Sequence, residues 1–380
     1  MRRRSMVVAL LTVPLILPPW SGATTQEPAA SPALTPVLAE FVGEVAIGRD
    51  ALRAPAGVAV DAARTLYVID AANNVVRIFA HDGTPIATWG ERGTGLGQFA
   101  FSEGHTIWGD LALGSDGNLY VLDALNSRVQ VITPDGTYVQ EWGGAGSAPG
   151  LFTDPKGIAI DRAGLIYIAD GGNRRVQVFD DVGHVLAKWG DPLLGGESLH
   201  DPTDVAIDAG GTVWVTDWVT QRVYRFATED TDFTGVGERG VLSADFSMPI
   251  GAAVDAHGTL YVADFHGHQI QVFAPDGAPL GSIGSVGVQP GQFLGPRYLT
   301  VSPDGLLYVA EEGNRRVSIF RLLQPLTSPA GTAGPTQTRR RGAAGQVRAT
   351  AGRQPGSTWL GSCWPAARSA WRSVAIVAAG

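Results

Sequence analysis

A unit of about 47 residues recurs along most of the chain, and this repeat constrains the fold more than any other feature. One marker of the unit is an acid after a short hydrophobic run, and the second is a glycine about 20 residues later. Both markers advance once by 53 residues and then by 47 at each step. Two markers that keep the same register indicate a structural repeat. The acids are Asp70, Asp123, Asp170, Asp217, Asp264 and Glu311, and the glycines are Gly90, Gly143, Gly190, Gly237 and Gly284.

The most regular copy of the unit runs from Pro155 to Gly190 and contains four short hydrophobic runs separated by turn-forming residues. Short alternating runs bounded by Asp, Asn and Gly predict β-strands joined by tight turns, and nothing in the unit predicts a helix. A four-stranded unit of this size buries only part of its surface, so it must pack against its neighbours. Six such units closed in a ring predict an all-β fold, a six-bladed β-propeller.

The two ends of the repeat region predict how the ring closes. The sixth unit stops matching after Phe320, where the expected fourth strand is missing. Phe41-Val42-Gly43, in contrast, lies about 47 residues before Trp89-Gly90, in the register of a fourth strand. We therefore expect residues 37–42 to supply the outer strand of the last blade, which would leave few unpaired strand edges.

The repeat resembles the NHL-repeat propellers, in which G-x-F-x-x-P precedes a short strand and L-Y-V-A-D-x-x-N-x-R-V-x-V-F follows it. The resemblance covers about residues 39–320, and it implies the fold but no activity, because related propellers serve as scaffolds, receptors and enzymes. The first pattern occurs at 150–155 and 291–296, and the second at 166–179 and 307–320. Departures from the patterns are Thr220 and Gly267 in place of Asn, Val75 and Gln269 in place of Arg, and six extra residues between Phe99 and Leu111.

The charge and cysteine content narrow the classes of partner and compartment. The chain has a net charge of -8, and its eight arginines from Arg321 onward are not accompanied by any acid, so the repeat region is more acidic still. An acidic surface repels phosphate backbones, which disfavours nucleic-acid binding. The single cysteine, Cys363, excludes an intramolecular disulfide, so stability must come from packing between blades.

The segments outside the repeat predict an exported protein. Three arginines, an apolar run from Met6 to Leu17 and the small residues Ser21-Gly22-Ala23 are typical of a secretory signal, expected at 1–23. The run is too short to span a bilayer, so we expect a secreted or cell-envelope protein without membrane insertion after signal removal. A flexible spacer is expected at 24–36, the propeller at 37–325 and a disordered basic Pro/Gly/Ala/Arg-rich tail at 326–380.

The repeated polar residues are expected to be structural. An Asp at a strand end accepts hydrogen bonds from backbone N–H groups of the following turn, and an Asn three residues later tolerates a left-handed conformation. The arginines that follow the turn are expected to pair with these acids between blades. Function should therefore be sought where the repeat varies. The repeated asparagines are Asn73, Asn126, Asn173 and Asn314, and the arginines are Arg128, Arg175, Arg222 and Arg316.

The most variable positions are the two residues that follow the proline before each innermost strand. Two acids, two bases and a phenol occur there, and nearby aromatic residues would complete a polar pocket with an aromatic rim at the mouth of the channel. Alternatively, Lys156, Asp204 and Arg297 neutralise one another across the channel. The predicted ligand-binding residues are Asp110, Lys156, Asp204, Arg297, Tyr298, Trp108, Trp218, Phe265 and His266.

Two metal sites are weighed against this pocket. An enzymatic relative, the lyase that cleaves peptidyl-hydroxyglycine, holds zinc with three histidines, one of which follows the proline. This chain has no histidine at those positions, although His105, His200, His266 and His268 lie in loops on the same face. The second metal site considered is a calcium site formed by Asp110, Asp204 and carbonyl groups, as in lactonase-like propellers.

Two functions remain open. The first is an exported binding or scaffold module that holds a small molecule, glycan or peptide, or a protein, on the insertion-bearing face. The second is a metal-dependent lyase or hydrolase with calcium or zinc in the same pocket. In that case Arg297 would bind an anionic group and Tyr298 would act as acid or base, with Asp110, Asp204 or His266 at the metal. The absence of a recognisable catalytic motif favours the binding module.

Overall fold

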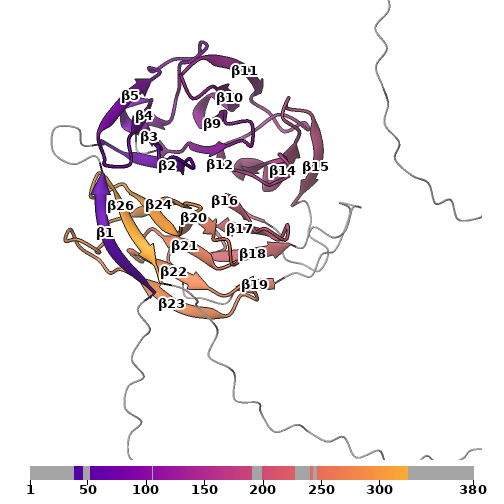
Figure 1. The fold of residues 1–380 in the computed structure, drawn as a ribbon. Helices are drawn as coiled ribbons and strands as arrows, with labels where there is room; N and C mark the ends of the chain where they lie inside the picture. Colours follow the sequence, from indigo (N-terminus) through magenta and orange to yellow (C-terminus); the bar gives the residue numbers. More distant parts are fainter. Residues whose placement is uncertain are drawn as a thin grey trace, which may run out of the picture. The chain divides into compact units, whose positions relative to one another are not determined.

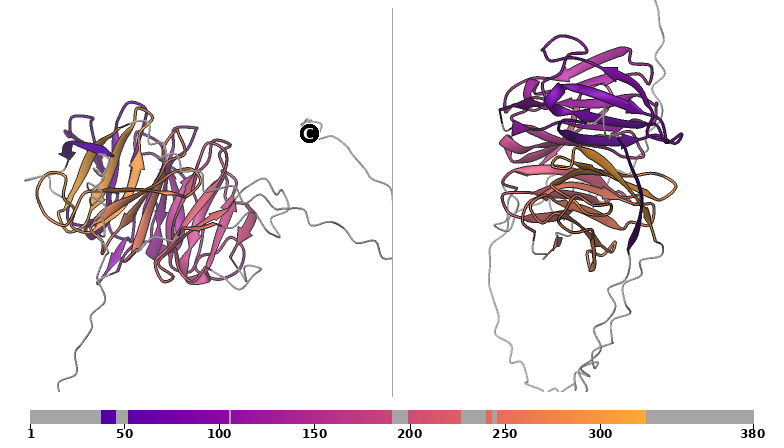
Figure 2. Two further views of the ribbon diagram at one scale, coloured as in Figure 1. Left: turned by 90° about the horizontal axis from the view of Figure 1, so that it is seen from below. Right: turned by 90° about the vertical axis from the view of Figure 1, so that its left-hand side faces the viewer.

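The computed structural model describes residues 38–45, 52–104, 106–190, 199–226, 240–242 and 246–323. These residues form six four-stranded antiparallel sheets arranged as the blades of a propeller (Figures 1 and 2), which confirms the predicted all-β class. The helical turns among them are three short 3-10 turns, one in each of the first three blades. The predicted signal, the spacer and all but the first residues of the region after Phe320 lie outside the described residues, as does His105.

Each blade is numbered from its inner to its outer strand. The first three blades are β2 (Pro55–Val60), β3 (Leu66–Asp70), β4 (Val75–Phe79) and β5 (Pro85–Trp89); β8 (Asp110–Leu113), β9 (Leu119–Asp123), β10 (Arg128–Ile132) and β11 (Tyr138–Gly143); and β12 (Pro155–Ile160), β13 (Ile166–Asp170), β14 (Arg175–Phe179) and β15 (Val185–Trp189). The next two are β16 (Pro202–Ile207), β17 (Val213–Asp217), β18 (Arg222–Phe226) and β19 (Gly240–Leu242); and β20 (Pro249–Val254), β21 (Leu260–Asp264), β22 (Gln269–Phe273) and β23 (Pro279–Ile283). The last is β24 (Pro296–Val301), β25 (Leu306–Glu311), β26 (Arg316–Leu322) and β1 (Ala39–Val45).

The N-terminal strand closes the ring, as the sequence predicts. Strand β1 pairs antiparallel with β26 and places Phe41 opposite Phe320, with a register shift between Phe41 and Gly43. The two rings pack edge to face, with centroids 5.6 Å apart. Because β1 precedes the first blade and β26 ends the last, this pairing joins the two ends of the repeat region in one sheet. Figure 1 shows β1 beside β26.

The repeated strand-end acids are structural, and Asp217 accepts the predicted hydrogen bonds from the following turn, from the Val219 and Thr220 N–H groups at 3.1 and 3.0 Å. In the first blade the partners differ from the prediction. Asp70 accepts hydrogen bonds from the backbone N–H groups of Arg53 and Ala54, at 3.0 and 3.2 Å, in the loop before the inner strand rather than mainly in the following turn. The Asn73 side chain also donates to Asp70 at 2.8 Å. The left-handed residue is the next one, Asn74, with φ of 54°. Each acid thus fixes the entry to its own blade.

The repeated arginines pair within a blade, which corrects the expectation of pairs between blades. The antiparallel register of β13 and β14 places Arg175 directly opposite Asp170, and the Arg175 Nε lies 2.7 Å from the Asp170 carboxylate. The same guanidinium donates to the carbonyl groups of Ala148 and Leu151 in the loop that leads in from the preceding blade. Arg128 and Arg316 make the same two kinds of contact, so these three arginines tie the connecting loop to the turn through bonds strengthened by charge.

The blade faces carry the hydrophobic core. Alternating strand residues pack against the neighbouring blade, and aromatic rings fill the wider outer part; Phe179, for example, contacts Trp142 and Phe152. The six extra residues of the second unit form a two-stranded ribbon, β6 (Ser102–Glu103) and β7 (Thr106–Ile107). In the part of the chain that the structure describes, no helix has the length and apolar character needed to cross a membrane.

Candidate functional site

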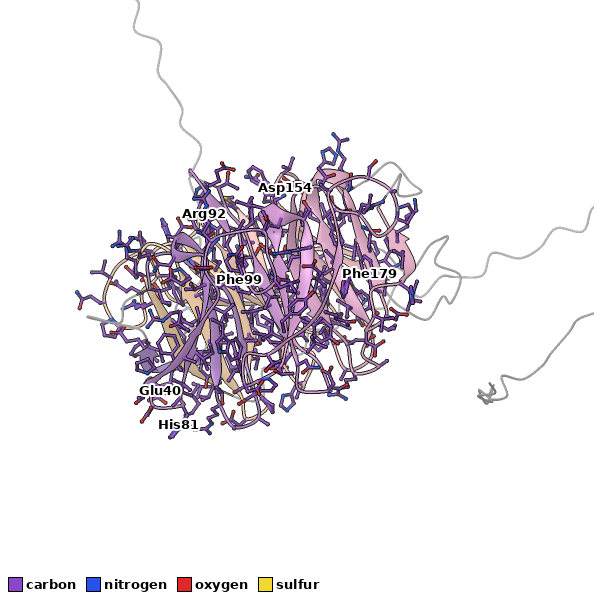
Figure 3. The ribbon with its side chains drawn as sticks, turned by 90° about the horizontal axis from the view of Figure 1, so that it is seen from above. Glu40, His81, Arg92, Phe99, Asp154 and Phe179 are labelled. Atoms are coloured by element: carbon purple, nitrogen blue, oxygen red, sulfur yellow. The ribbon has the colours of Figure 1, made fainter. Side chains whose placement is uncertain are left out.

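The propeller has two faces that we name by labelled residues. Arg92 and Asp154 lie on one face, called the top face, and His81 and Glu40 lie on the other, called the bottom face (Figure 3). The six inner strands run from the top face to the bottom face, because each begins next to the strand-end acid of its own blade and ends at the opposite turn. Residues at the start of an inner strand therefore lie near the top, and those at its end near the bottom.

A central cavity of about 270 Å³ lies between the six inner strands and is lined by residues from every blade. The lining side chains near the bottom face, such as Val60, Ile160 and Val301, are only half-buried. Those nearest the top face, Asp110 and Tyr298, are 6% and 1% exposed. This gradient places the accessible end of the cavity at the bottom face and its closed end beneath the top face.

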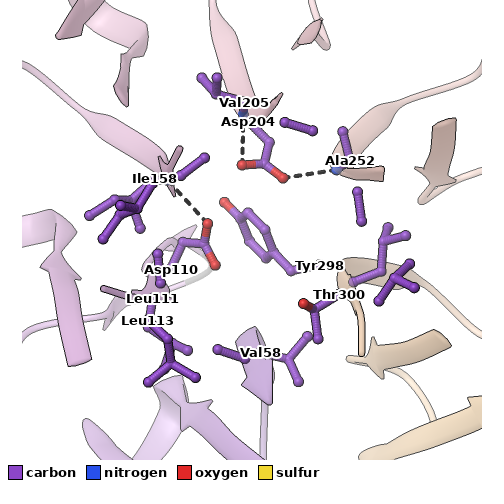
Figure 4. A pocket seen from close by; sticks show the side chains of 18 of the residues that line it. Val58, Asp110, Leu111, Leu113, Ile158, Asp204, Val205, Ala252, Tyr298 and Thr300 are labelled. Atoms are coloured by element: carbon purple, nitrogen blue, oxygen red, sulfur yellow. Dashed lines mark hydrogen bonds between the residues drawn. The ribbon is translucent and has the colours of Figure 1, made fainter. Parts of the chain in front are cut away.

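The closed end is formed by the side chains of Asp110, Asp204 and Tyr298, which we call the floor (Figure 4). These residues occupy the second position of the variable pair in every other blade, and the blades between them carry glycine there. A Cβ atom built on Gly157 would lie 2.6 Å from the Asp204 Cα, and one built on Gly57 would lie 2.5 Å from the Asp110 Cα. The alternating glycines thus give the three larger side chains room to converge on the axis.

Backbone groups hold each floor side chain in place. Asp110 accepts a hydrogen bond from the Ile158 N–H at 3.1 Å, and Asp204 accepts one from the Ala252 N–H at 2.8 Å. Each acid thereby binds the free inner edge of the next blade. The Tyr298 hydroxyl donates to the carbonyl group of Lys156 at 2.8 Å, across the axis. In Figure 4 the phenol oxygen points between the two carboxylates.

The buried floor favours protonated carboxyl groups. Burial raises the pKa of Asp110 to about 7. Burial, followed by the charge of Asp110, raises the pKa of Asp204 well above its usual value. Burial and then the two acids also hold the pKa of Tyr298 well above its usual value. Two buried carboxyl groups without a cation disfavour double ionisation, so the pair retains at least one proton near pH 7.

Above the floor, Lys156, Trp108 and Arg297 form a second layer, which we call the cap. The Trp108 ring contacts both cations, with its centroid 5.1 Å from the Lys156 Nζ and 4.9 Å from the Arg297 guanidinium carbon. Lys156 is 1% exposed, Trp108 9% and Arg297 6%. The cap therefore covers the floor on the side of the top face, where the sequence predicts the pocket mouth.

Acids outside the predicted pocket neutralise the cations of the cap. The Lys156 Nζ lies 2.6 Å from Asp154 and 2.5 Å from Asp201. Arg297 pairs with Glu312 at 2.6 Å and donates to the Ile107 carbonyl group. Among the described residues no Lys, Arg or His pairs with Asp204, so the structure does not show mutual neutralisation of Lys156, Asp204 and Arg297.

The remaining predicted residues surround the cap. Trp218 donates its indole N–H to Asp201 at 2.6 Å, and Phe265 lies 5.5 Å from the Arg297 guanidinium carbon. His266 is exposed, and its ring lies 5.2 Å from that of the neighbouring Phe265. The nine predicted residues thus separate into a floor of three, a cap of three, two supports and one surface histidine.

The residues considered for a metal do not form a ligand set. No group of three or more His, Cys, Asp or Glu side chains suited to a metal converges within the described residues. His266 lies on the surface, whereas Asp110 and Asp204 are buried beneath the cap. The His268 ring accepts a hydrogen bond from the Gly295 N–H at 3.0 Å. In the calcium site predicted from Asp110, Asp204 and carbonyl groups, the two carboxylates would supply at most four of the six to eight oxygens that Ca²⁺ takes.

Comparison with known proteins supports the fold. The NHL repeat model matches residues 152–179 and 246–273. Virginiamycin B lyase from Staphylococcus aureus is 14% identical with a TM-score of 0.51, and the alignment covers 75% of this chain and 100% of that one. A gluconolactonase from Xanthomonas campestris is 17% identical with a TM-score of 0.52, covering 75% and 95%.

A protein of unknown function from Bacteroides thetaiotaomicron is 16% identical with a TM-score of 0.55, and the alignment covers 75% of this chain and 73% of that one. No curated protein sequence matches the chain. At these identities the similarity extends to the propeller fold and not to the chemistry of the relatives.

Proposed function

The chain is an NHL-repeat propeller, and we propose that it acts as a binding module that holds a small ligand in its central channel. The observation that carries this proposal is the floor at the closed end of the channel. Burying two carboxyl groups without a cation costs free energy, and a purely structural axis would be more stable with apolar residues there. Groups that lower stability in this way are typical of functional sites.

The shape of the cavity supports the same proposal. Its volume of about 270 Å³ suits a small molecule rather than a folded partner, and aliphatic side chains with a few convergent polar groups are typical of ligand sites. The approach that we propose is from the bottom face, because the cap covers the floor from the top face. We also propose that the protein is exported, on the basis of the N-terminal sequence.

We do not extend the proposal to lyase or hydrolase chemistry. The residues considered for that chemistry are held in other contacts: the Arg297 guanidinium is paired with Glu312, and the Tyr298 hydroxyl donates to a backbone carbonyl group. The lyase and the gluconolactonase named above share the fold with this chain, and fold alone does not transfer an activity.

The test is a thermal-shift screen of a metabolite library against the full chain and a variant with a filled channel. Thr300 is half-buried and lines the cavity (Figure 4), so Thr300→Phe should obstruct it. The matched control is Thr88→Phe, the same change at an exposed position on the outer strand β5. Compounds that stabilise the natural chain and Thr88→Phe, but not Thr300→Phe, support the proposal. If every stabilising compound stabilises the natural chain and both variants equally, the proposal is contradicted. It is also contradicted if no compound stabilises the natural chain.

A further inference from the structure

We propose that the floor binds the primary ammonium group of a slim aliphatic amine, whose carbon chain extends down the channel. This inference rests on the proposed function, since it names the class of ligand for the same cavity. It depends on three properties of the described residues: the hydrogen-bonding roles of the floor, the charge balance around it and the composition of the walls.

The floor offers acceptors to the cavity. The Tyr298 hydroxyl donates its proton to the Lys156 carbonyl group, so the phenol oxygen keeps its lone pairs as acceptors. The carboxylates of Asp110 and Asp204 accept hydrogen bonds from backbone N–H groups and have remaining lone pairs. Three acceptor groups from alternate blades converge on the axis, and an alkylammonium carries three N–H donors.

The charge balance favours a cation. Within the described residues no ion pair reaches Asp110 or Asp204. Both cations of the cap are paired with acids, because Lys156 contacts two acids and Arg297 contacts a third, although the buried Arg297 Nε–H has no hydrogen-bond partner among the described residues. The layer above the floor thus holds more carboxylates than bases. A cationic ligand would supply the missing counter-charge, and pairing a buried charge removes a large desolvation cost.

The walls combine aliphatic side chains with the polar backbone of the inner strands. Below the floor the lining side chains are those of Val, Ala, Ile and Leu, with Thr300 as the polar exception besides the floor itself. Because the inner strands turn their free edges to the channel, polar atoms make up most of the exposed lining. A carbon chain that contacts these side chains therefore gains less than the value of about 0.8 kcal/mol for each CH₂ group that full removal from water contributes. For a bare divalent ion, the side chains of the floor supply fewer than the six to eight oxygens that Ca²⁺ takes.

Uptake of an ammonium group should be linked to protonation. The titratable groups of the floor are Asp110 on β8, Asp204 on β16 and Tyr298 on β24, while β2 and β20 contribute none to the lining. The charged groups that face the floor from the cap side are Lys156 on β12, Arg297 on β24 and Asp154 before β12. Because burial raises the pKa of both acids, the floor holds a proton near neutral pH. An ammonium that replaces this proton should bind more tightly as the pH rises through about 7.

The experiment is isothermal titration of the full chain at pH 7.5 with n-hexylammonium chloride, with n-hexanol as the neutral probe. Titrations in two buffers of different ionisation enthalpy report the protons released. We expect saturable binding of hexylammonium, proton release, and weaker binding of hexanol. Asp204→Asn should weaken hexylammonium binding at least tenfold, since a charged hydrogen bond contributes about 1.5–3 kcal/mol. Asp181→Asn, the same change at an exposed turn residue, should leave it unchanged.

A second variant separates folding from recognition. Thr300→Phe leaves the floor intact, and it should abolish binding by occupying the space of the carbon chain. Circular dichroism would confirm that Asp204→Asn and Thr300→Phe keep the propeller fold. Equal binding of hexanol and hexylammonium that Thr300→Phe abolishes would overturn the ammonium inference and leave the channel proposal standing. Binding of neither probe, or hexylammonium binding that Asp204→Asn and Asp181→Asn leave equally unchanged, would also overturn the inference. Failure of the metabolite screen would remove the proposed function as well.

Discussion

Replacing Asp110 with asparagine should stabilise the protein at alkaline pH and have less effect at acidic pH. Burial raises the pKa of the Asp110 carboxyl from 3.8 to about 7. One pKa unit corresponds to about 1.4 kcal/mol, so ionising Asp110 costs about 4 kcal/mol more in the folded protein than in the unfolded chain. The asparagine oxygen can still accept the hydrogen bond from the Ile158 N–H, and it carries no charge.

The direction follows from proton binding. Between pH 3.8 and about 7 the folded protein keeps the Asp110 proton that the unfolded chain has lost. The contribution of this group to the free energy of unfolding is therefore fully present below the unfolded pKa and is lost as the pH rises through the folded pKa. The difference between variant and natural chain should grow by about 3 kcal/mol from pH 5 to pH 8 in favour of Asp110→Asn.

The assay is urea unfolding followed by tryptophan fluorescence at pH 5 and pH 8. Comparing each variant with the natural chain at the same pH cancels the titration of groups that do not interact with Asp110. Asp204 is the exception, because the Asp110 charge that helps to raise its pKa is absent from the variant. Asp181→Asn provides the control, because Asp181 is exposed in the turn between β14 and β15 and should show the same small difference at both pH values. A free-energy difference for Asp110→Asn that is independent of pH would refute the account of the floor.

Three further substitutions test other parts of the structure by urea unfolding. Arg175→Ala leaves the buried Asp170 without its cation and should lower the free energy of unfolding by about 3–5 kcal/mol. Arg64→Ala, at an exposed ion pair, should lower it by at most about 1 kcal/mol. Equal losses would contradict the role of the repeated arginines. Gly157→Ala places a Cβ 2.6 Å from the Asp204 Cα and should lower the free energy of unfolding by about 1–3 kcal/mol. Gly43→Ala has open space around its Cβ and should lower it less. The reverse order would contradict the role of the alternating glycines in making room for the floor. Trp108→Ala removes the ring between two cations and should cost about 3–5 kcal/mol, and an unchanged stability would rule out the cap as a packed layer.

The blade structure was predictable because its signal is local and repeated. Short buried runs such as Ile166–Asp170, with turn formers on either side, indicate a strand, and six copies in one register indicate the ring. The closing strand was predictable for the same reason, since Phe41 keeps the register of the outer strands. The partner of Arg175 was also within reach, because residues on either side of a tight hairpin turn face each other, but the expectation of pairs between blades overlooked this.

The residues of the floor and of the cap were both among the predicted ligand-binding residues, but the closure of the cap over the floor was not predicted. Asp110, Asp204 and Tyr298 stand at positions where the other blades have glycine, and this alternation is visible in the sequence. The closure of the top face depends on Trp108, which reaches the axis from a ribbon that has no counterpart in the other blades. Its stacking with Lys156 joins segments far apart in the sequence, and no local pattern carries that information.

The access route could not be predicted because it depends on side chains from all six blades. Loops on the top face vary most, which suggested a ligand site there, but the acids that neutralise Lys156 and Arg297 fill that region. The sequence signal for one of these contacts is the acid that precedes the proline, as at Asp154 and Asp201. Asp154 lies two residues before Lys156, and in an extended segment at the start of a strand such an acid can pair with the lysine.

The most direct test of a ligand in the channel is a crystal structure of the full chain grown with n-hexylammonium chloride at pH 7.5. We expect density along the axis between the inner strands, with the nitrogen within hydrogen-bonding distance of Asp110 and Asp204 and the carbon chain directed toward the bottom face. An empty channel in crystals that hold the ligand elsewhere, or density on the top face beside Trp218 and His266, would contradict it.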